Sequence, residues 1–326
     1  MASRKGINLP RLQKILERQN ISRWGKDYTP SILATPQEAP SISHASTLNS
    51  AKLGREIHVL STPERHAALL ALYHPKLLDL HEQKMLSVGA RPHPLFGYLD
   101  TIGTDLPPIQ GLIDVAERLG YMSFLPRLKV DNPQDFSNPR VVVFPYIGDF
   151  LLFLRGSDGG IYCVNWTVKD TESSFKRPGP SSSKMLPKNK ESQTSIARHE
   201  IEETYYCDAD IRTVRISGDK IHPHVAANLT QLFGYHRTEL TLNLSEQDEM
   251  LNKFRIALDA GISAMDVILM LTANGRFTSH ECRTVFYQSI WERKLRVDLF
   301  RPILIDRQIA PENQDVLVEY ADWFKV

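Results

Sequence analysis

The chain has 326 residues, of which 42% are hydrophobic and 24% charged, and its formal net charge is +1. It is long enough for two domains, and the near-neutral charge excludes a strong binder of polyanions as a whole. The longest apolar runs, 150–154 and 267–271, are too short to cross a bilayer, and no signal peptide is recognisable. We therefore expect a cytoplasmic protein with no membrane partner. Its three widely spaced cysteines fit reduced thiols better than a disulfide framework or a zinc site.

The N-terminal segment, residues 1–50, is predicted to be a basic helix followed by an extended arm. Residues 1–26 hold seven basic side chains against one acid, which favours either an arm that contacts phosphates or a solvated terminus. Apolar residues at helical spacing predict a short amphipathic helix over 9–20. Residues 27–50 are rich in Ser, Thr and Pro, which indicates an arm lying over the body of the protein.

The central segment, residues 51–240, mixes helix and strand signals around one hairpin. The predicted elements are helices over 63–73, 110–119, 194–207 and 222–233, strands over 77–81 and 211–217, and a hairpin over 140–169. Residues 171–195 form a polar, low-complexity insert that we expect to be mobile. The pattern predicts an α/β domain, with helices packed on a mixed sheet.

The C-terminal segment, residues 241–326, has the pattern of a winged helix. Apolar periodicity predicts helices over 246–259 and 262–273. Thr278 and Glu281 form a capping box for a third helix, which runs to about residue 294. Residues 295–305 then predict a strand or wing, so we expect a helical domain of winged-helix type.

Three ionisable side chains in separate segments carry the chemistry. Glu64 opens a predicted helix, Asp149 begins an apolar run, and Lys169 ends the next one. The turn over 156–160 joins the two runs, so the hairpin sets an acid opposite a lysine. Carboxylates bind Mg²⁺, and a lysine beside them can position or deprotonate water. This combination is typical of metal-dependent phosphodiester hydrolysis.

Each of these residues also has a structural interpretation. Glu64 fits a capping box with Ser61, Asp149 could bind turn amides, and Lys169 could be solvated. The spacing of an acid and a lysine around one hairpin is a weak signal by itself. Glu82 and Gln83 follow a predicted strand, where they either line the cleft or fix its loop.

Four ordered segments favour the catalytic interpretation over the structural one. They are Trp24-Gly-Lys-Asp-Tyr-Thr-Pro30, Gly54-Arg-Glu-Ile-His-Val-Leu-Ser-Thr-Pro-Glu64, Leu77-Leu-Asp-Leu-His-Glu-Gln83, and Gly148-Asp149-Phe-Leu with Thr167-Val-Lys169. In this order and with these gaps, the chain resembles TnsA, the endonuclease subunit of heteromeric cut-and-paste transposases. The resemblance covers most of its length.

The resemblance implies a restriction-endonuclease-like fold for residues 51–240. It implies that Glu64 and Asp149 bind Mg²⁺ (or Mn²⁺), that the backbone carbonyl of Val168 completes the site, and that Lys169 lies beside the attacking water. Thr167 stands where the family has a glutamine. Its hydroxyl is the expected substitute ligand, and whether one metal or two are bound stays open.

The resemblance further implies cleavage of double-stranded DNA on the 5′ side of transposon ends, in the bacterial cytoplasm. A separate DDE-type transposase would cut and join the 3′ ends. Residues 241–326 would contact DNA, the transposase or an AAA+ ATPase regulator. Two alternatives remain: a free-standing restriction or repair nuclease on the same fold, and a non-catalytic winged-helix regulator whose nuclease site has decayed.

Overall fold

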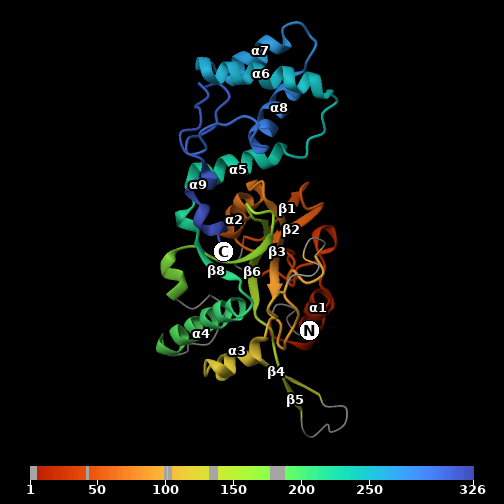
Figure 1. Cartoon of the computed structure of the whole chain (residues 1–326), viewed down its shortest axis with the longest axis vertical. Helices are drawn as coiled ribbons and strands as arrows, with labels where there is room; N and C mark the ends of the chain where they lie inside the picture. The colour runs from red at the N-terminus through yellow and green to blue at the C-terminus, as the bar shows by residue number, and fades with distance from the viewer. Residues whose placement is uncertain (1–5, 42–43, 99–100, 102–104, 132–138, 177–187) are drawn as a thin grey trace. The chain divides into compact units, whose positions relative to one another are not determined.

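The computed structural model describes residues 6–41, 44–98, 101, 105–131, 139–176 and 188–326 (Figure 1). The chain forms two compact units. The first comprises residues 1–67, 76–220 and 323–326, and the second comprises residues 68–75 and 221–322. The second unit thus takes in residues 68–75 and 221–240, which were predicted to belong to the domain of residues 51–240.

The first unit is built on a four-stranded mixed sheet in the order β3-β6-β7-β8. The strands are β3 (Leu77–Met85), β6 (Ile147–Arg155), β7 (Ile161–Lys169) and β8 (Arg212–Ser217). The first three run antiparallel, and β8 is parallel to β7. Helices α3 (Leu112–Arg118) and α4 (Lys188–Cys207) bury a core against one face of this sheet. The predicted α/β class, with a mixed sheet flanked by helices, is confirmed.

The predicted hairpin is strands β6 and β7. Its turn is closed by the Gly156 N–H, which donates to the Gly160 carbonyl at 2.7 Å, and Gly159 has a φ of 88° that favours glycine. Phe150 pairs with Trp166, and both side chains are fully buried. Because both faces of this hairpin are covered, residues 150–154 of β6 and 163–168 of β7 are buried in succession instead of alternating, and the polar Asn165 and Thr167 are among them.

The N-terminal helix and arm pack around this sheet. Helix α1 (Leu9–Gln19) is present where predicted, with Asn8 as its N-cap. Within residues 27–50, which were predicted to be an extended arm, the last part is strand β1 (Ser46–Ser50), which pairs with β2 (Arg55–Val59). A second small sheet joins β4 (Arg127–Val130) to β5 (Arg140–Val143).

Several predicted boundaries shift. Helix α2 (Thr62–Tyr73) is as predicted, whereas β3 continues four residues beyond His81, to Met85. Of the predicted mobile insert, residues 177–187 lie outside the described part of the chain. Residues 172–176 form the 3-10 helix η4, and α4 already begins at Lys188. Both described flanks of the predicted insert are therefore helical.

The regular elements described in the second unit are helices, joined by irregular segments. The unit contains α5 (Pro223–Tyr235), α6 (Leu244–Ala260), α7 (Ala264–Thr272), α8 (Ser279–Trp291) and the short α9 (Val316–Glu319). The predicted capping box of Thr278 and Glu281 begins α8. Phe254 and Phe286 meet in its core, with ring centroids 5.0 Å apart.

The strand predicted at 295–305 is wrong. The segment makes only isolated bridges, such as Val297 to Pro311, and no β-strand occurs among the residues described in this unit. Pro302 explains part of this, since proline lacks the N–H that a β-ladder needs and restricts Arg301 before it.

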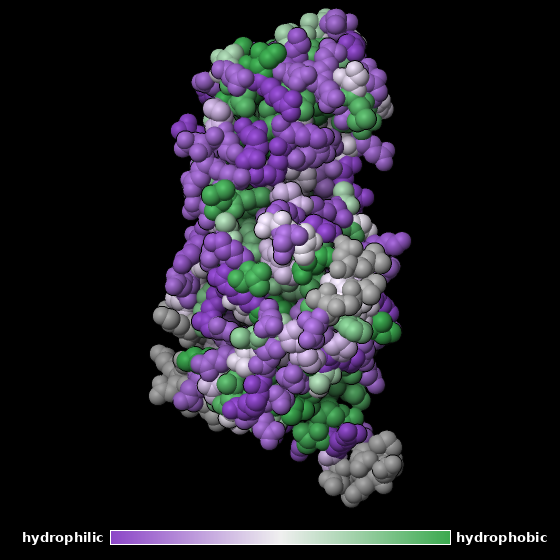
Figure 2. Space-filling view, viewed as in Figure 1, coloured by the Kyte–Doolittle hydropathy of each residue, from purple (hydrophilic) through white to green (hydrophobic). Residues whose placement is uncertain are grey.

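Within the described ranges, no helix is long and apolar enough to span a bilayer. Hydrophobic residues on the face shown in Figure 2 form patches among hydrophilic ones, as on most protein surfaces.

Candidate active site

The structure brings Glu64, Asp149 and Lys169 together in the first unit. Glu64 lies in the first turn of α2, Asp149 is the third residue of β6, and Lys169 is the last residue of β7. Burial raises the pKa of Glu64 to about 7, the charge of Asp149 acts in the same direction, and Lys169 opposes both. Two acids and an amine from three elements therefore share one electrostatic environment.

Glu64 is held by neutral donors. Its Oε2 accepts from the Leu60 N–H at 2.8 Å and from Gln83 Nε2 at 3.0 Å, and its Oε1 accepts from the Ser61 hydroxyl at 3.0 Å. Ser61 Oγ also accepts from the Glu64 N–H at 3.3 Å. The contacts with Ser61 expected of a helix cap therefore coexist with the approach to Asp149. Capping and metal binding are not alternatives for this side chain.

Asp149 lies where β6 and β7 separate. Their ladder ends at the pair Phe150 and Trp166, and Asp149 is the next residue of β6 outside the ladder. Beyond it, Asp149 Oδ2 accepts from the Val168 N–H at 2.7 Å, so a side chain replaces the next strand contact. This bond places the backbone of Val168 beside the carboxylate, as a shared metal site would require.

Gln83 connects the two acids. The pairs of Glu82 with Phe150 and Lys84 with Gly148 place Gln83 opposite Asp149 across the sheet. Its side chain donates to Glu64, and its φ of 48° lies in the left-handed region, a strained conformation for glutamine. Gln83 is buried and lines the site, which was one of the two roles open to it.

Glu82, its neighbour, has the other role. It is fully buried, and both of its oxygens pair with Arg55, at 2.8 and 2.9 Å. Its Oε1 also accepts from the His58 N–H at 3.1 Å. Glu82 therefore fixes β2 against β3 and takes no part in the site.

Sequence reasoning missed Glu202, which approaches from α4. Its Oε1 accepts from the Thr167 hydroxyl at 3.0 Å and from Asn165 Nδ2 at 3.1 Å. The side chain is 2% exposed, and burial raises its pKa, with Asp149 adding to the effect. One signal could have identified it: Glu202 lies four residues before the buried Tyr206, on the inward face of its helix.

Thr167, the expected substitute ligand, is buried and donates to Glu202. A carboxylate thus stands behind the hydroxyl at the position where the resemblance implies a glutamine. Thr167 is paired across the sheet with Arg215 of β8, and Lys169 with Ser217. Lys169 forms no ion pair with any residue that the structure describes.

The side chains fit Mg²⁺ better than a metal that needs a closed protein cage. Within the described chain, no group of three or more His, Cys, Asp and Glu side chains is placed to hold a metal ion. What the site offers is Glu64, Asp149 and the nearby main chain of Val168. Mg²⁺ usually binds one or two carboxylates and keeps several waters, whereas structural zinc needs four protein ligands.

The comparisons with known proteins add no relative. No family model matches the chain, and no curated protein matches it. The interpretation of function therefore depends on the geometry and chemistry of the site.

Proposed function

We propose that the protein is a Mg²⁺-dependent DNA endonuclease whose first unit has a restriction-endonuclease-like fold. The observation that supports this most is the convergence of Glu64, Asp149 and an amine, Lys169, that no described carboxylate neutralises in an ion pair. If these residues served only to stabilise the fold, we would expect the Lys169 amine to form an ion pair with one of the acids. Here the acids accept from neutral donors and the lysine is left to act on a third group.

Each residue has a definite task in this proposal. Glu64, Asp149 and the carbonyl of Val168 would hold Mg²⁺, or Mn²⁺ in its place. The bound ion would polarise the scissile phosphate and lower the pKa of a bound water. Lys169 orients the attacking water and offsets the charge that develops on the phosphate. Gln83 positions the Glu64 carboxylate through its hydrogen bond.

Glu202 acts on the site through Thr167. By accepting from the Thr167 hydroxyl, it fixes the end of β7 on which Lys169 stands two residues later. Asp149 fixes the same end through the Val168 N–H. The orientation of Lys169 therefore depends on two hydrogen bonds to buried or partly buried acids.

The biological role follows from the resemblance to TnsA. We infer that the protein cuts the 5′ side of transposon ends in a bacterial cytoplasm, as one subunit beside a DDE-type transposase. The second unit serves as a winged-helix-like domain that contacts DNA, the transposase or an AAA+ ATPase regulator. The arm supports this assignment, since the Gly25 N–H donates to Asp79 Oδ2 at 2.6 Å and thereby joins two of the resembling segments.

The test is cleavage of a duplex that joins a transposon end to flanking DNA, with the partner DDE-type transposase present. Asp149→Asn should lower the 5′-cleavage rate by at least about a thousandfold, since it removes a metal ligand while keeping the bond to Val168. Mn²⁺ binding, measured by titration of the protein in the absence of DNA, should weaken as well. The matched control is Asp114→Asn, an exposed acid paired with Arg118 on α3.

Two results would count against the proposal. Normal 5′ cleavage by Asp149→Asn would remove this residue from the mechanism. Failure of the wild-type protein to bind Mn²⁺ would favour the decayed, non-catalytic regulator. Nicking of plasmid DNA by the purified protein alone would instead favour the free-standing nuclease on the same fold.

A further inference from the structure

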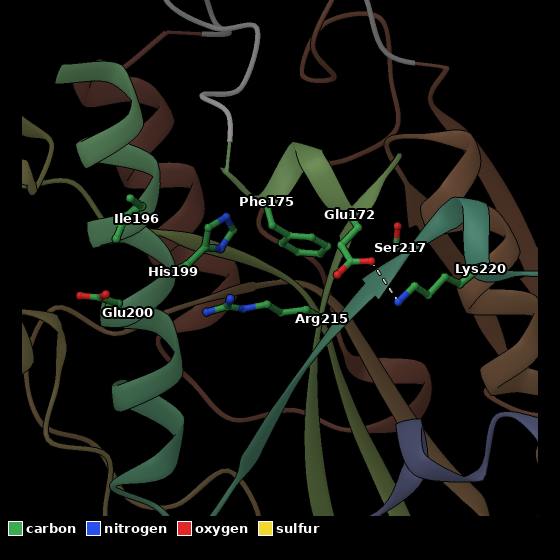
Figure 3. A pocket seen from close by; sticks show the side chains of 8 residues that line it. All are labelled: Glu172, Phe175, Ile196, His199, Glu200, Arg215, Ser217 and Lys220. Carbon is green, nitrogen blue, oxygen red and sulfur yellow. Dashed lines mark ion pairs between the residues drawn. The ribbon is translucent and has the colours of Figure 1, made fainter. Parts of the chain in front are cut away.

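A pocket of about 270 Å³ opens on the β8 side of the candidate active site. It lies between η4, α4, β8 and the short 3-10 helix η5 (Gly218–Lys220), and Figure 3 shows its side chains. Its lining residues are Glu172, Phe175, Ile196, His199, Glu200, Arg215, Ser217 and Lys220. None of these residues has a task in the proposed cleavage reaction.

The pocket continues directly from the site. Arg215 and Ser217 are the cross-strand partners of Thr167 and Lys169 in the parallel ladder of β7 and β8. Neighbouring strands lie about 4.8 Å apart, and paired residues project to the same face. A strand of DNA with one phosphate at Lys169 would therefore meet the pocket within about one nucleotide.

The charges that act on His199, at one end of the pocket, are positive. After burial, the causes that lower the pKa of His199 to about 4 are the charges of Lys169, Arg198 and Arg215, and no acid counteracts them. The His199 ring is therefore neutral at pH 7 and lies in a positive environment. Such an environment attracts an anion.

Two acids at the rim are in exposed ion pairs, and a third, Glu200, accepts from the Tyr121 hydroxyl at 2.5 Å. Lys220 Nζ lies 3.1 Å from Glu172, and Arg215 Nη2 lies 2.9 Å from Glu203; all four side chains are at least half exposed. Exposed pairs of this kind contribute about 0–1 kcal/mol, so a phosphate can replace the acids at little cost. Figure 3 shows Arg215 extending from β8 toward α4 and Lys220 on the opposite side, beside Glu172.

One wall of the pocket is apolar. The Phe175 ring lies against His199, with centroids 5.6 Å apart, and Ile196 is 43% exposed beside it. A site for a free inorganic ion would not need such a wall. A phosphodiester carries an apolar sugar next to its charge, and this wall matches the sugar.

We propose, on the basis of the nuclease function above, that this pocket binds the phosphodiester adjacent to the scissile one on the strand being cut. Arg215 and Lys220 contact its non-bridging oxygens, and Phe175 and Ile196 contact the neighbouring sugar. The pocket thereby fixes the direction in which the strand crosses Lys169.

The test is binding of a fluorescent DNA duplex to the full chain at several NaCl concentrations, with Ca²⁺ in place of Mg²⁺. Arg215→Ala and Lys220→Ala should each weaken binding about tenfold at moderate salt, and each should reduce the slope of log K against log [NaCl] by about one. Arg118→Ala is the matched control, because Arg118 is also a half-exposed arginine paired with surface acids. It should leave the slope unchanged.

The outcomes separate this proposal from the nuclease function. Unchanged slopes in both variants, or wild-type protein that binds no duplex, would overturn the pocket's role. If the slopes fall as expected but Asp149→Asn still cuts DNA, the pocket stands and the assigned catalytic residues fail. Circular dichroism of each variant shows whether a change in affinity comes from unfolding.

Discussion

Two neighbouring residues of β3, Glu82 and Gln83, contact two different clusters of buried acids. Glu82 lies in a paired cluster with Arg55, Asp79 and His81. In it, Arg55 binds both oxygens of Glu82, and His81 Nε2 lies 3.2 Å from Asp79 Oδ2. Gln83 contacts the site cluster, which consists of Glu64, Asp149, Glu202 and Lys169.

The net pKa shift of Asp79 in the paired cluster is opposite to that of Glu64 and Glu202 in the site cluster. In the paired cluster, hydrogen bonds and charges from His81, Gly25 and Arg55 outweigh burial, so the pKa of Asp79 is lowered. In the site cluster, burial prevails and raises the pKa of Glu64 and Glu202. Burying a carboxylate without a counter-ion is costly, and in our proposal the bound Mg²⁺ would offset that cost.

The largest expected effect breaks the paired cluster. Arg55→Met leaves the Glu82 carboxylate buried without a partner, so the free energy of unfolding should fall by about 3–5 kcal/mol. Urea denaturation measures this loss. Arg118→Met, which removes an exposed pair, should change the free energy by less than about 1 kcal/mol. An equally small change in Arg55→Met would show that Glu82 does not depend on its ion pair.

The second largest expected effect is a pH dependence of stability caused by Glu64, a buried acid without an ion pair. Its pKa in the folded state, about 7, exceeds the ordinary value of 4.5. Between these values the folded state binds more protons than the unfolded state, so stability falls as pH rises from about 4.5 to 7. The displacement corresponds to about 3 kcal/mol. Glu64→Gln should therefore flatten this part of the stability profile in metal-free buffer.

Magnesium provides the control for that measurement. Mg²⁺ binds the ionised carboxylate, so it should restore the stability of the wild-type protein at pH 8 and have little effect on Glu64→Gln. Parallel profiles of the two proteins between pH 4.5 and 7, without metal, would contradict the raised pKa of Glu64.

The same contrast explains what the sequence could predict. Signals confined to a few residues were sufficient for the capping box of Thr278, the helix α1 and the hairpin of β6 and β7. The strand predicted at 295–305 is absent, since apolar alternation says nothing about whether a partner strand exists. In the site, Glu64, Asp149 and Lys169 could be named because each begins or ends a recognisable element.

The contribution of α4 could not be predicted in the same way. Glu202 reaches Thr167 only because α4 packs on the sheet after a polar insert, and no local pattern fixes that packing. The positive φ of Gln83 is likewise set by tertiary contacts, among them the Ser31 N–H, which donates to the Gln83 carbonyl at 3.1 Å. Residues that position others depend on these contacts, and the sequence order of motifs does not record them.

The smallest expected effect comes from replacing one buried glutamate by glutamine in each cluster. Glu202→Gln keeps an oxygen that can accept from Thr167 and removes a buried charge that no ion pair compensates. The free energy of unfolding at pH 8 should stay the same or rise by up to about 1 kcal/mol. Glu82→Gln is the matched control, and it should destabilise the protein because the buried Arg55 loses its partner.

Cleavage kinetics complete the comparison. If Glu202 positions β7 through its hydrogen bond to Thr167, Glu202→Gln should keep kcat within about twofold, whereas Glu202→Leu should lower kcat about tenfold with KM unchanged. A large loss of activity in Glu202→Gln would mean that its negative charge is needed beside Asp149. In that case Glu202 would belong among the groups that bind the metal, and positioning through Thr167 would be wrong.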